Sequence, residues 1–121
     1  MTNAGLSILH VCGREMIREL RDEILRLQGY EVISTASVDD VPAIFRKQSY
    51  ALVLIEVDGE SRVAQAEKLC SEIKAIQPEQ AVAFVCNHRV SIHSDCPDEV
   101  IRSEFNPEAL VKGVQQLVTG S

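Results

Sequence analysis

The segment YALVLIE, residues 50–56, decides the fold, because five consecutive apolar residues are followed directly by a carboxylate. An uninterrupted apolar run of this kind is typical of a strand that is buried on both faces in the middle of a parallel sheet. Glu56 then lies at the carboxyl end of that strand. Ligands of open α/β sheets bind at the carboxyl ends of the strands, so Glu56 is the first candidate for a functional residue.

Strand and helix patterns alternate along the rest of the chain. Further strands are predicted at residues 6–11, 30–36, 81–86 and 100–103, and helices at 14–28, 37–48, 61–77 and 107–118. Ser37 or Asp39 is expected to cap the second helix, and Ser61 the third. This alternation favours a three-layer, doubly wound α/β fold, in which helices cover both faces of a parallel sheet of five strands.

The first predicted helix is amphipathic. Its apolar residues recur at steps of three and four, and we expect them to face the sheet: Ile17, Leu20, Ile24 and Leu27. The charged residues between them are expected to face water: Arg18, Glu19, Arg21, Asp22 and Arg26. The helix is predicted to end at Gly29.

Composition indicates an ordinary globular protein. A length of 121 residues suits one domain spanning residues 1–121, and a net charge of −6 without a basic cluster argues against direct nucleic-acid binding. No apolar run is long enough to cross a membrane, and the start of the chain does not resemble a secretory signal, so we expect a cytoplasmic protein. In that compartment the four cysteines, Cys12, Cys70, Cys86 and Cys96, are expected to be free thiols, with Cys70 in the core.

The sequence resembles the receiver domains of bacterial response regulators over residues 8–118. The resemblance rests on IRELRDEILRLQGYEV at residues 17–32, YALVLIE at 50–56 and FNPEAL at 105–110. It implies a flavodoxin-like sheet of order 2-1-3-4-5. Residues 87–98 are irregular and contain Pro97, so we expect the fourth helix of this fold to be shortened or irregular.

The positions that carry the phosphorylation chemistry of the receiver family are occupied by other residues in this chain. The acid pair falls on Cys12 and Gly13, the phosphoacceptor Asp on Glu56, the Ser/Thr on Cys86 and the Lys on Ser103. A thiol and a glycine supply none of the oxygen ligands that Mg²⁺ requires. Lengthening the acceptor side chain by one methylene also disturbs in-line phosphoryl transfer. Phosphorylation of Glu56 is therefore not expected.

Two interpretations of Glu56 remain open from the sequence. In the first, Glu56 is a permanent carboxylate that stands in for a phosphorylated or metal-bound Asp, and Arg14 supplies its counter-charge. In the second, it is a relic that is solvated at the edge of the sheet, where ion pairs contribute little.

Other chemistries are weaker alternatives. Two Cys and two His lie within a short segment and form a conceivable zinc ligand set, although their spacing is unlike that of structural zinc sites: Cys86, His88, His93 and Cys96. A redox role for Cys12 and Cys86 is a further alternative, as is a receiver that still responds to phosphate or Mg²⁺ through Asp58.

The function expected from the sequence is that of an atypical receiver, or pseudo-receiver, in two-component phosphorelay signalling. It would act by protein–protein interaction without Asp phosphorylation. We expect it to be neither an enzyme nor a cofactor-binding protein. The expected partner is a histidine kinase, another regulator or an output protein. A homodimer stays open, whereas membrane binding is not expected.

Overall fold

The computed structural model describes residues 5–87, 89–103 and 107–119. The strands are β1 Ser7–Val11, β2 Glu31–Thr35, β3 Leu52–Glu56, β4 Val82–Cys86 and β5 Glu99–Arg102. The helices are α1 Glu15–Leu27, α2 Val41–Phe45, α3 Val63–Ile76 and α4 Pro107–Thr119, and short 3-10 turns, η1 Val38–Asp40 and η2 Glu60–Arg62, precede α2 and α3. None of the described helices is both long and apolar enough to span a bilayer.

The sheet is parallel throughout and has the strand order β2-β1-β3-β4-β5. The expected flavodoxin-like order is thereby confirmed. β3 lies in the centre of the sheet, as its apolar sequence predicts. The register pairs His10 of β1 with Leu54 of β3, so Cys12 and Glu56 follow two residues later at the same end of the sheet.

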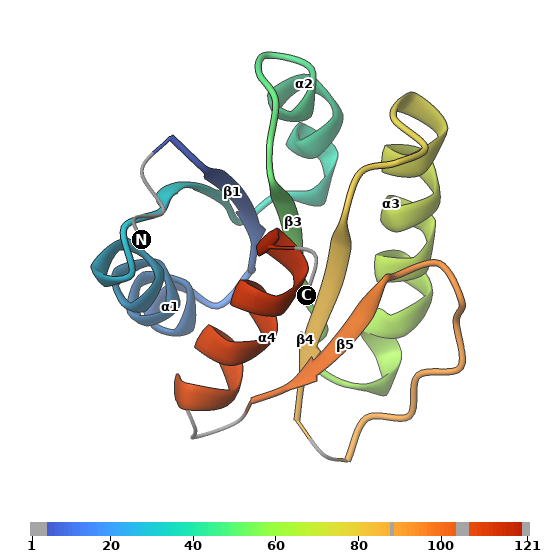
Figure 1. Cartoon of the computed structure of the whole chain (residues 1–121). Coiled ribbons are helices and arrows are strands. Elements are labelled where there is room, and N and C mark those ends of the chain that lie inside the picture. The colour runs from blue at the N-terminus through green and yellow to red at the C-terminus, as the bar shows by residue number, and fades with distance from the viewer. Residues whose placement is uncertain (1–4, 88, 104–106, 120–121) are drawn as a thin grey trace.

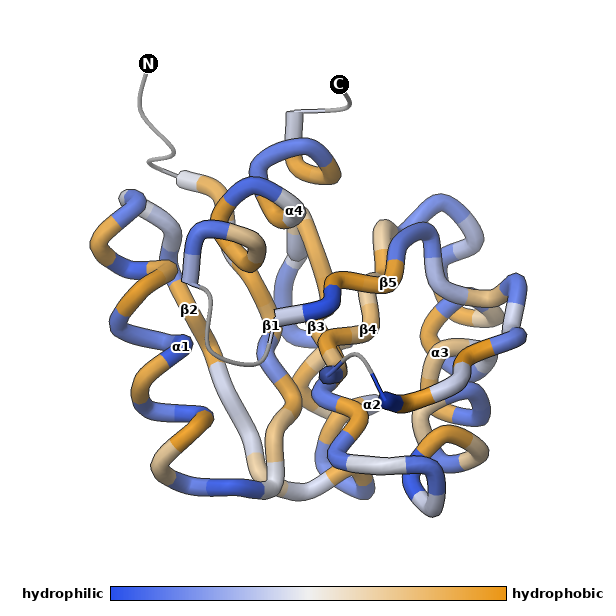
Figure 2. Tube along the Cα trace, turned by 90° about the horizontal axis from the view of Figure 1, so that it is seen from below, coloured by the Kyte–Doolittle hydropathy of each residue, from blue (hydrophilic) through white to orange (hydrophobic). Residues whose placement is uncertain are grey.

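Helices cover both faces of the sheet (Figure 1). On one face, α1 and α4 pack over a cluster that includes Ile8, Leu52 and Leu54, and on the other α2 and α3 pack over Leu9, Val53 and their neighbours. In Figure 2, hydrophobic residues predominate in the central strands β3 and β4, whereas both classes alternate along the helices. Successive strand residues point to opposite faces, so His10 shares the α1/α4 face with Ile8.

The second and third helices begin later than the sequence predicts. Ser37 makes no side-chain capping hydrogen bond, and η1 precedes a short α2 that ends at Phe45 rather than near residue 48. Ser61 lies inside η2, after Gly59, whose φ is 146°, and α3 begins at Val63. In both places a 3-10 turn occupies the residues that we expected to form the first helical turn.

The charged face of α1 is the largest departure from prediction. Arg21 and Asp22 are buried, with 7% and 4% exposure, whereas Leu20 and Leu27 are 59% and 74% exposed. The helix is therefore rotated from the orientation that its apolar periodicity predicts. Burying a charged side chain costs free energy unless it has a partner, and each of these two residues has a partner on a strand that α1 covers.

The segment between β4 and β5 is irregular, as expected, and its described residues, 87 and 89–98, form no helix. A disulfide joins Cys96 of this segment to Cys70 of α3, whose Cα atoms lie 6.3 Å apart. The prediction of free thiols is therefore wrong for these two residues and holds for Cys12 and Cys86. Proximity of Cys70 and Cys96 depends on the path of an irregular segment, which periodicity does not predict.

Candidate functional site

Glu56 ends β3 with its carboxylate inside the protein. Its side chain is only 3% exposed, so the solvation that the second interpretation of Glu56 expected is wrong. The side chain points to the α1/α4 face, where positively charged groups from α1 and β1 approach it. A buried carboxylate requires such compensation, because desolvation penalises its charge.

Arg21 of α1 is the principal counter-charge of Glu56. Its Nη1 forms an ion pair with Glu56 Oε2, and its Nη2 donates a hydrogen bond of 2.6 Å to the carbonyl oxygen of Ser103. A planar guanidinium suits this double contact, because its donors point in fixed directions. Arg21 thus connects the carboxyl end of β3 to the residue that follows β5.

His10 and Asp22 extend this buried group of charges. His10 Nδ1 donates to Asp22 Oδ1 over 2.8 Å, and the other ring nitrogen, Nε2, lies 3.8 Å from Glu56 Oε2. Burial alone would lower the pKa of His10, but the hydrogen bond to Asp22 and the contact with Glu56 outweigh it and raise this pKa from its ordinary value of 6.5. The imidazole is fully buried.

The same contacts keep Glu56 charged. Burial alone would raise the pKa of Glu56, yet His10 and Arg21 together lower it from its ordinary value of 4.5. The pKa of Asp22 is lowered in the same way. Burial alone would raise it, but the hydrogen bond from His10 favours the charged carboxylate and outweighs burial. Asp22 and Glu56 are therefore both held as carboxylates by the basic groups that they contact.

Arg14, the residue predicted to supply the counter-charge, lies at the rim. Its Nη2 is 3.5 Å from Glu56 Oε1, and its Nε is 3.0 Å from Asp58 Oδ1. The side chains of Arg14 and Asp58 are 47% and 45% exposed, so this second ion pair is screened by water. Arg14 is near Glu56, but Arg21 makes the buried contact that sequence reasoning missed.

The other positions implied by the resemblance lie around this group. Cys12 is 1% exposed, and its thiol donates a weak hydrogen bond to the carbonyl oxygen of Arg14 at 3.5 Å. Burial and the charge of Glu56 both raise the pKa of Cys12. Cys86 is 2% exposed and lies 3.6 Å from Arg102 Nη1. Cys12, Glu56, Cys86 and Ser103 therefore meet at one end of the sheet, as the strand order requires.

A cavity of about 390 Å³ is lined by Glu56 but by neither Arg21 nor Ser103. Its lining includes Gly13, Arg14, Asp58 and Arg62. A smaller space of about 130 Å³ is lined by Arg21, Glu56 and Ser103 together with their neighbours. Solvent thus reaches the vicinity of the site from two directions, although the carboxylate itself is almost wholly covered.

The zinc ligand set considered for the segment after β4 does not assemble in the described residues. Cys96 forms the disulfide with Cys70, and neither Cys86 nor His93 belongs to a group of three or more metal-binding side chains among the residues that the structure describes. His88 lies outside the described residues. The described residues bring together a different set, His10, Cys12 and Glu56.

The Mg²⁺ ion that the receiver resemblance implies does not fit these side chains. Mg²⁺ requires near-octahedral oxygen coordination, whereas the groups here are an imidazole, a thiol and one carboxylate. The site as built is therefore not one for Mg²⁺.

Comparison with known proteins finds similar solved structures but no matching family model or curated sequence. TrrA from Thermotoga maritima, a response regulator in complex with Mg²⁺ and BeF, is 25% identical with a TM-score of 0.79, over 93% of this chain and 98% of that one. The same regulator in complex with the histidine kinase ThkA is 25% identical with a TM-score of 0.78, over 93% and 97%.

The chemotaxis response regulator CheY4 of Vibrio cholerae shares the fold at 18% identity, with a TM-score of 0.78 over 93% of this chain and 98% of that one. These likenesses extend over nearly the whole chain and include its strand order. They show that this chain has the fold of the receiver domains of response regulators.

Proposed function

We propose that this chain is a pseudo-receiver of two-component signalling, which acts by binding a protein partner and not by phosphorylation of Glu56. The observation that supports this proposal most directly is the ion pair between Arg21 and Glu56. Phosphoryl transfer to a carboxylate requires an oxygen that is free to attack. Here Oε2 of Glu56 is paired with Arg21, Oε1 lies 3.5 Å from Arg14 Nη2, and the side chain is 3% exposed.

The permanent pairing suggests a single conformation. In a receiver that is switched by phosphate, the site changes its charge and neighbouring groups move in response. In this chain Arg21 already connects Glu56 to the backbone of Ser103. We infer that Arg21 holds the ends of β3 and β5 together without any phosphorylation, and the proposal assigns no catalysis to the chain.

The exposed side of α1 is the surface that best suits a partner. Met16, Leu20 and Leu27 are 83%, 59% and 74% exposed, and their spacing places them along one side of the helix. Large apolar side chains grouped on a surface are typical of protein interaction sites. A similar solved structure holds a histidine kinase bound to a response regulator, so we propose a helical partner of the histidine-kinase class.

An NMR titration tests the loss of phosphoacceptor chemistry. Labelled protein is titrated with Mg²⁺ and then with beryllofluoride, and TrrA from Thermotoga maritima, whose structure contains both, serves as the positive control. We expect the amide resonances of Glu56, Cys86 and Ser103 to stay in place while those of TrrA shift. Saturable shifts centred on Glu56 or Asp58 would refute the proposal.

A binding assay tests the partner surface. Dimerisation domains of histidine kinases from the same genome are purified and titrated with the chain and with its Leu20→Glu variant. We expect one of them to bind, and the variant to bind at least about tenfold more weakly, because the charge must be desolvated in the interface. Gln116→Glu on α4 is the matched control, because Gln116 is exposed and does not line the groove that Leu27 lines. Equal affinity of the wild type and Leu20→Glu would exclude this side of α1 as the contact.

A further inference from the structure

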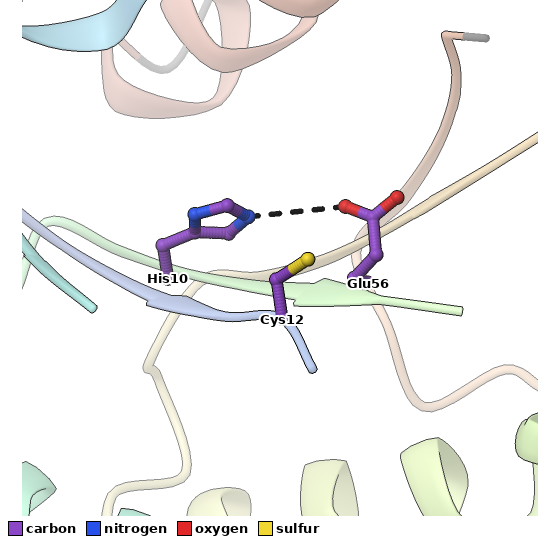
Figure 3. Close-up of side chains that lie close together, drawn as sticks. All are labelled: His10, Cys12 and Glu56. Carbon is purple, nitrogen blue, oxygen red and sulfur yellow. Dashed lines mark ion pairs between the residues drawn. The ribbon is translucent and has the colours of Figure 1, made fainter. Parts of the chain in front are cut away.

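The sheet brings three metal-binding side chains of different chemistry to one point. His10 and Cys12 are two residues apart at the end of β1 and share a face, and Glu56 is beside them at the end of β3. One ligand atom from each lies within 4.8 Å of the others. Figure 3 shows the imidazole and the carboxylate directed at each other, with the thiol of Cys12 between them.

The hydrogen bonding of His10 suits a metal ligand. Nδ1 donates to Asp22 over 2.8 Å, which leaves Nε2 as the nitrogen that faces Cys12 and Glu56. Metal-binding histidines characteristically donate their other ring N–H to a carboxylate, which orients the ring and raises its basicity. Asp22 is itself buried, at 4% exposure, so this orientation is well defined.

Nε2 has no hydrogen-bond partner in the described structure although the ring is fully buried. Its distance of 3.8 Å to Glu56 Oε2 is too long for a hydrogen bond. Two ligand atoms on one tetrahedral zinc, each bonded at about 2.1 Å, lie about 3.4 Å apart. The observed separation is thus closer to that of two zinc ligands than to that of a hydrogen-bonded pair.

We propose that His10, Cys12 and Glu56 form a zinc-binding site, with Asp22 orienting His10. Nitrogen, sulfur and carboxylate oxygen are the donors that zinc takes in proteins, and three of them leave one coordination position for water or a partner's side chain. The softness of the thiolate favours zinc over Mg²⁺ or Ca²⁺. The site does not depend on the partner interaction proposed above.

Charge balance agrees with a divalent ion. With Cys12 as a thiolate, the buried anions are Cys12, Glu56 and Asp22, and Arg21 offsets one of the three. Zinc supplies the two missing positive charges. His10 Nε2 faces Glu56 Oε2, the same oxygen that Arg21 Nη1 contacts, so a metal bound there would displace Arg21 from Oε2 toward the other carboxylate oxygen, Oε1. Zinc binding would therefore alter the contact of Arg21 with Glu56, and through Arg21 the position of Ser103.

Metal reconstitution tests the site. The untagged full chain is treated with EDTA, kept anaerobic without reductant so that the Cys70–Cys96 disulfide persists, and titrated with Zn²⁺ or Co²⁺. We expect about one equivalent of tightly bound metal per chain and, with Co²⁺, the near-ultraviolet absorption that marks a cobalt–thiolate bond. The matched pair is Cys12→Ser and Cys86→Ser, because both thiols are free and buried at the same end of the sheet.

The outcomes separate the site from adventitious binding. Cys12→Ser should lose the cobalt–thiolate absorption, Cys86→Ser should keep it, and Asp22→Asn should weaken zinc binding by roughly 10- to 100-fold. Amide spectra of each variant verify that it is folded. Binding of less than about a tenth of an equivalent by the folded wild type, or equal binding by Cys12→Ser, would overturn the proposal. Neither result bears on the beryllofluoride titration, so the two proposals fail separately.

Discussion

Replacing Arg21 with Met tests the buried ion pair quantitatively. The variant keeps the length of the side chain but leaves Glu56, at 3% exposure, without its principal counter-charge. Removing one partner of a buried pair costs about 3–5 kcal/mol, and His10 still faces Glu56, so we expect the lower end, about 3 kcal/mol. Domains of this size are stabilised by about 5–15 kcal/mol in total, so the loss is a large fraction.

Urea denaturation followed by circular dichroism, with EDTA present, measures this loss. An m-value of about 1.5 kcal/mol per molar urea converts 3 kcal/mol into a midpoint lower by about 2 M. Arg26→Met is the matched control, because Arg26 lies on the same helix, is exposed and donates a hydrogen bond of 3.3 Å to the carbonyl oxygen of Val32. Its substitution should cost less than about 1 kcal/mol.

A double variant completes the test. Arg21→Met combined with Glu56→Leu replaces both charges by apolar groups, and such replacements are often close to neutral. We therefore expect the double variant to be more stable than Arg21→Met alone. If Arg21→Met lowers the midpoint no more than Arg26→Met does, the buried pair does not exist in solution, and the argument for a permanently paired Glu56 is refuted.

Three further predictions concern the network, the disulfide and α1. The pKa of His10 in the folded protein is raised above 6.5, so the stabilisation from His10 is present below pH 6.5 and is lost as the pH rises through the folded pKa. The difference in unfolding free energy between the wild type and His10→Gln should therefore shrink over that range. A difference that grows would contradict the assignment. Reducing the Cys70–Cys96 disulfide, which spans 26 residues, should lower the unfolding free energy by about 3 kcal/mol. Urea denaturation with and without a dithiol measures this loss, and identical denaturation curves would argue against the disulfide. Leu20→Ala should lower the unfolding free energy by less than about 0.5 kcal/mol because Leu20 is 59% exposed, whereas Leu25→Ala should lower it by about 3 kcal/mol because Leu25 is 0% exposed. The reverse order in the same urea denaturation experiments would show that α1 has the orientation that its periodicity predicts.

The zinc site and the ion pair place the same demand on Glu56. Arg21 occupies one carboxylate oxygen in the structure, and zinc would require an oxygen as well. The two cations are therefore coupled through a single side chain. Since Arg21 also contacts the carbonyl of Ser103, such coupling would extend from the metal to the end of β5.

The amphipathic pattern of α1 shows how sequence reasoning fails in this chain. Periodicity counts apolar residues and assigns charged ones to water, which holds when no partner exists inside the protein. Arg21 and Asp22 have partners on strands β3 and β1, and these contacts outweigh the burial of Leu20 and Leu27. Each pair joins a helix to a strand, so the apolar periodicity of the helix alone reveals neither partner.

One signal of the missed site was present in the sequence. His10 and Cys12 are separated by a single residue at the end of a predicted strand, a spacing that places both side chains on one face. Their proximity to Glu56 followed from the strand order, which places β1 beside β3. The orientation of His10 by Asp22 could not be predicted in the same way, because it depends on the rotation of α1.

The sequence alone determined the three-layer α/β class, the approximate extent of each strand and the position of Glu56 at the carboxyl end of a central strand. Apolar periodicity is a local property, and burial of a strand or helix face is its direct physical consequence. Only the tertiary structure decided that Arg21 pairs with Glu56, that Asp22 holds His10, and that Cys70 meets Cys96. Each of these is a contact between elements, and its free energy depends on desolvation and on distances that are set only when the helices have packed against the sheet.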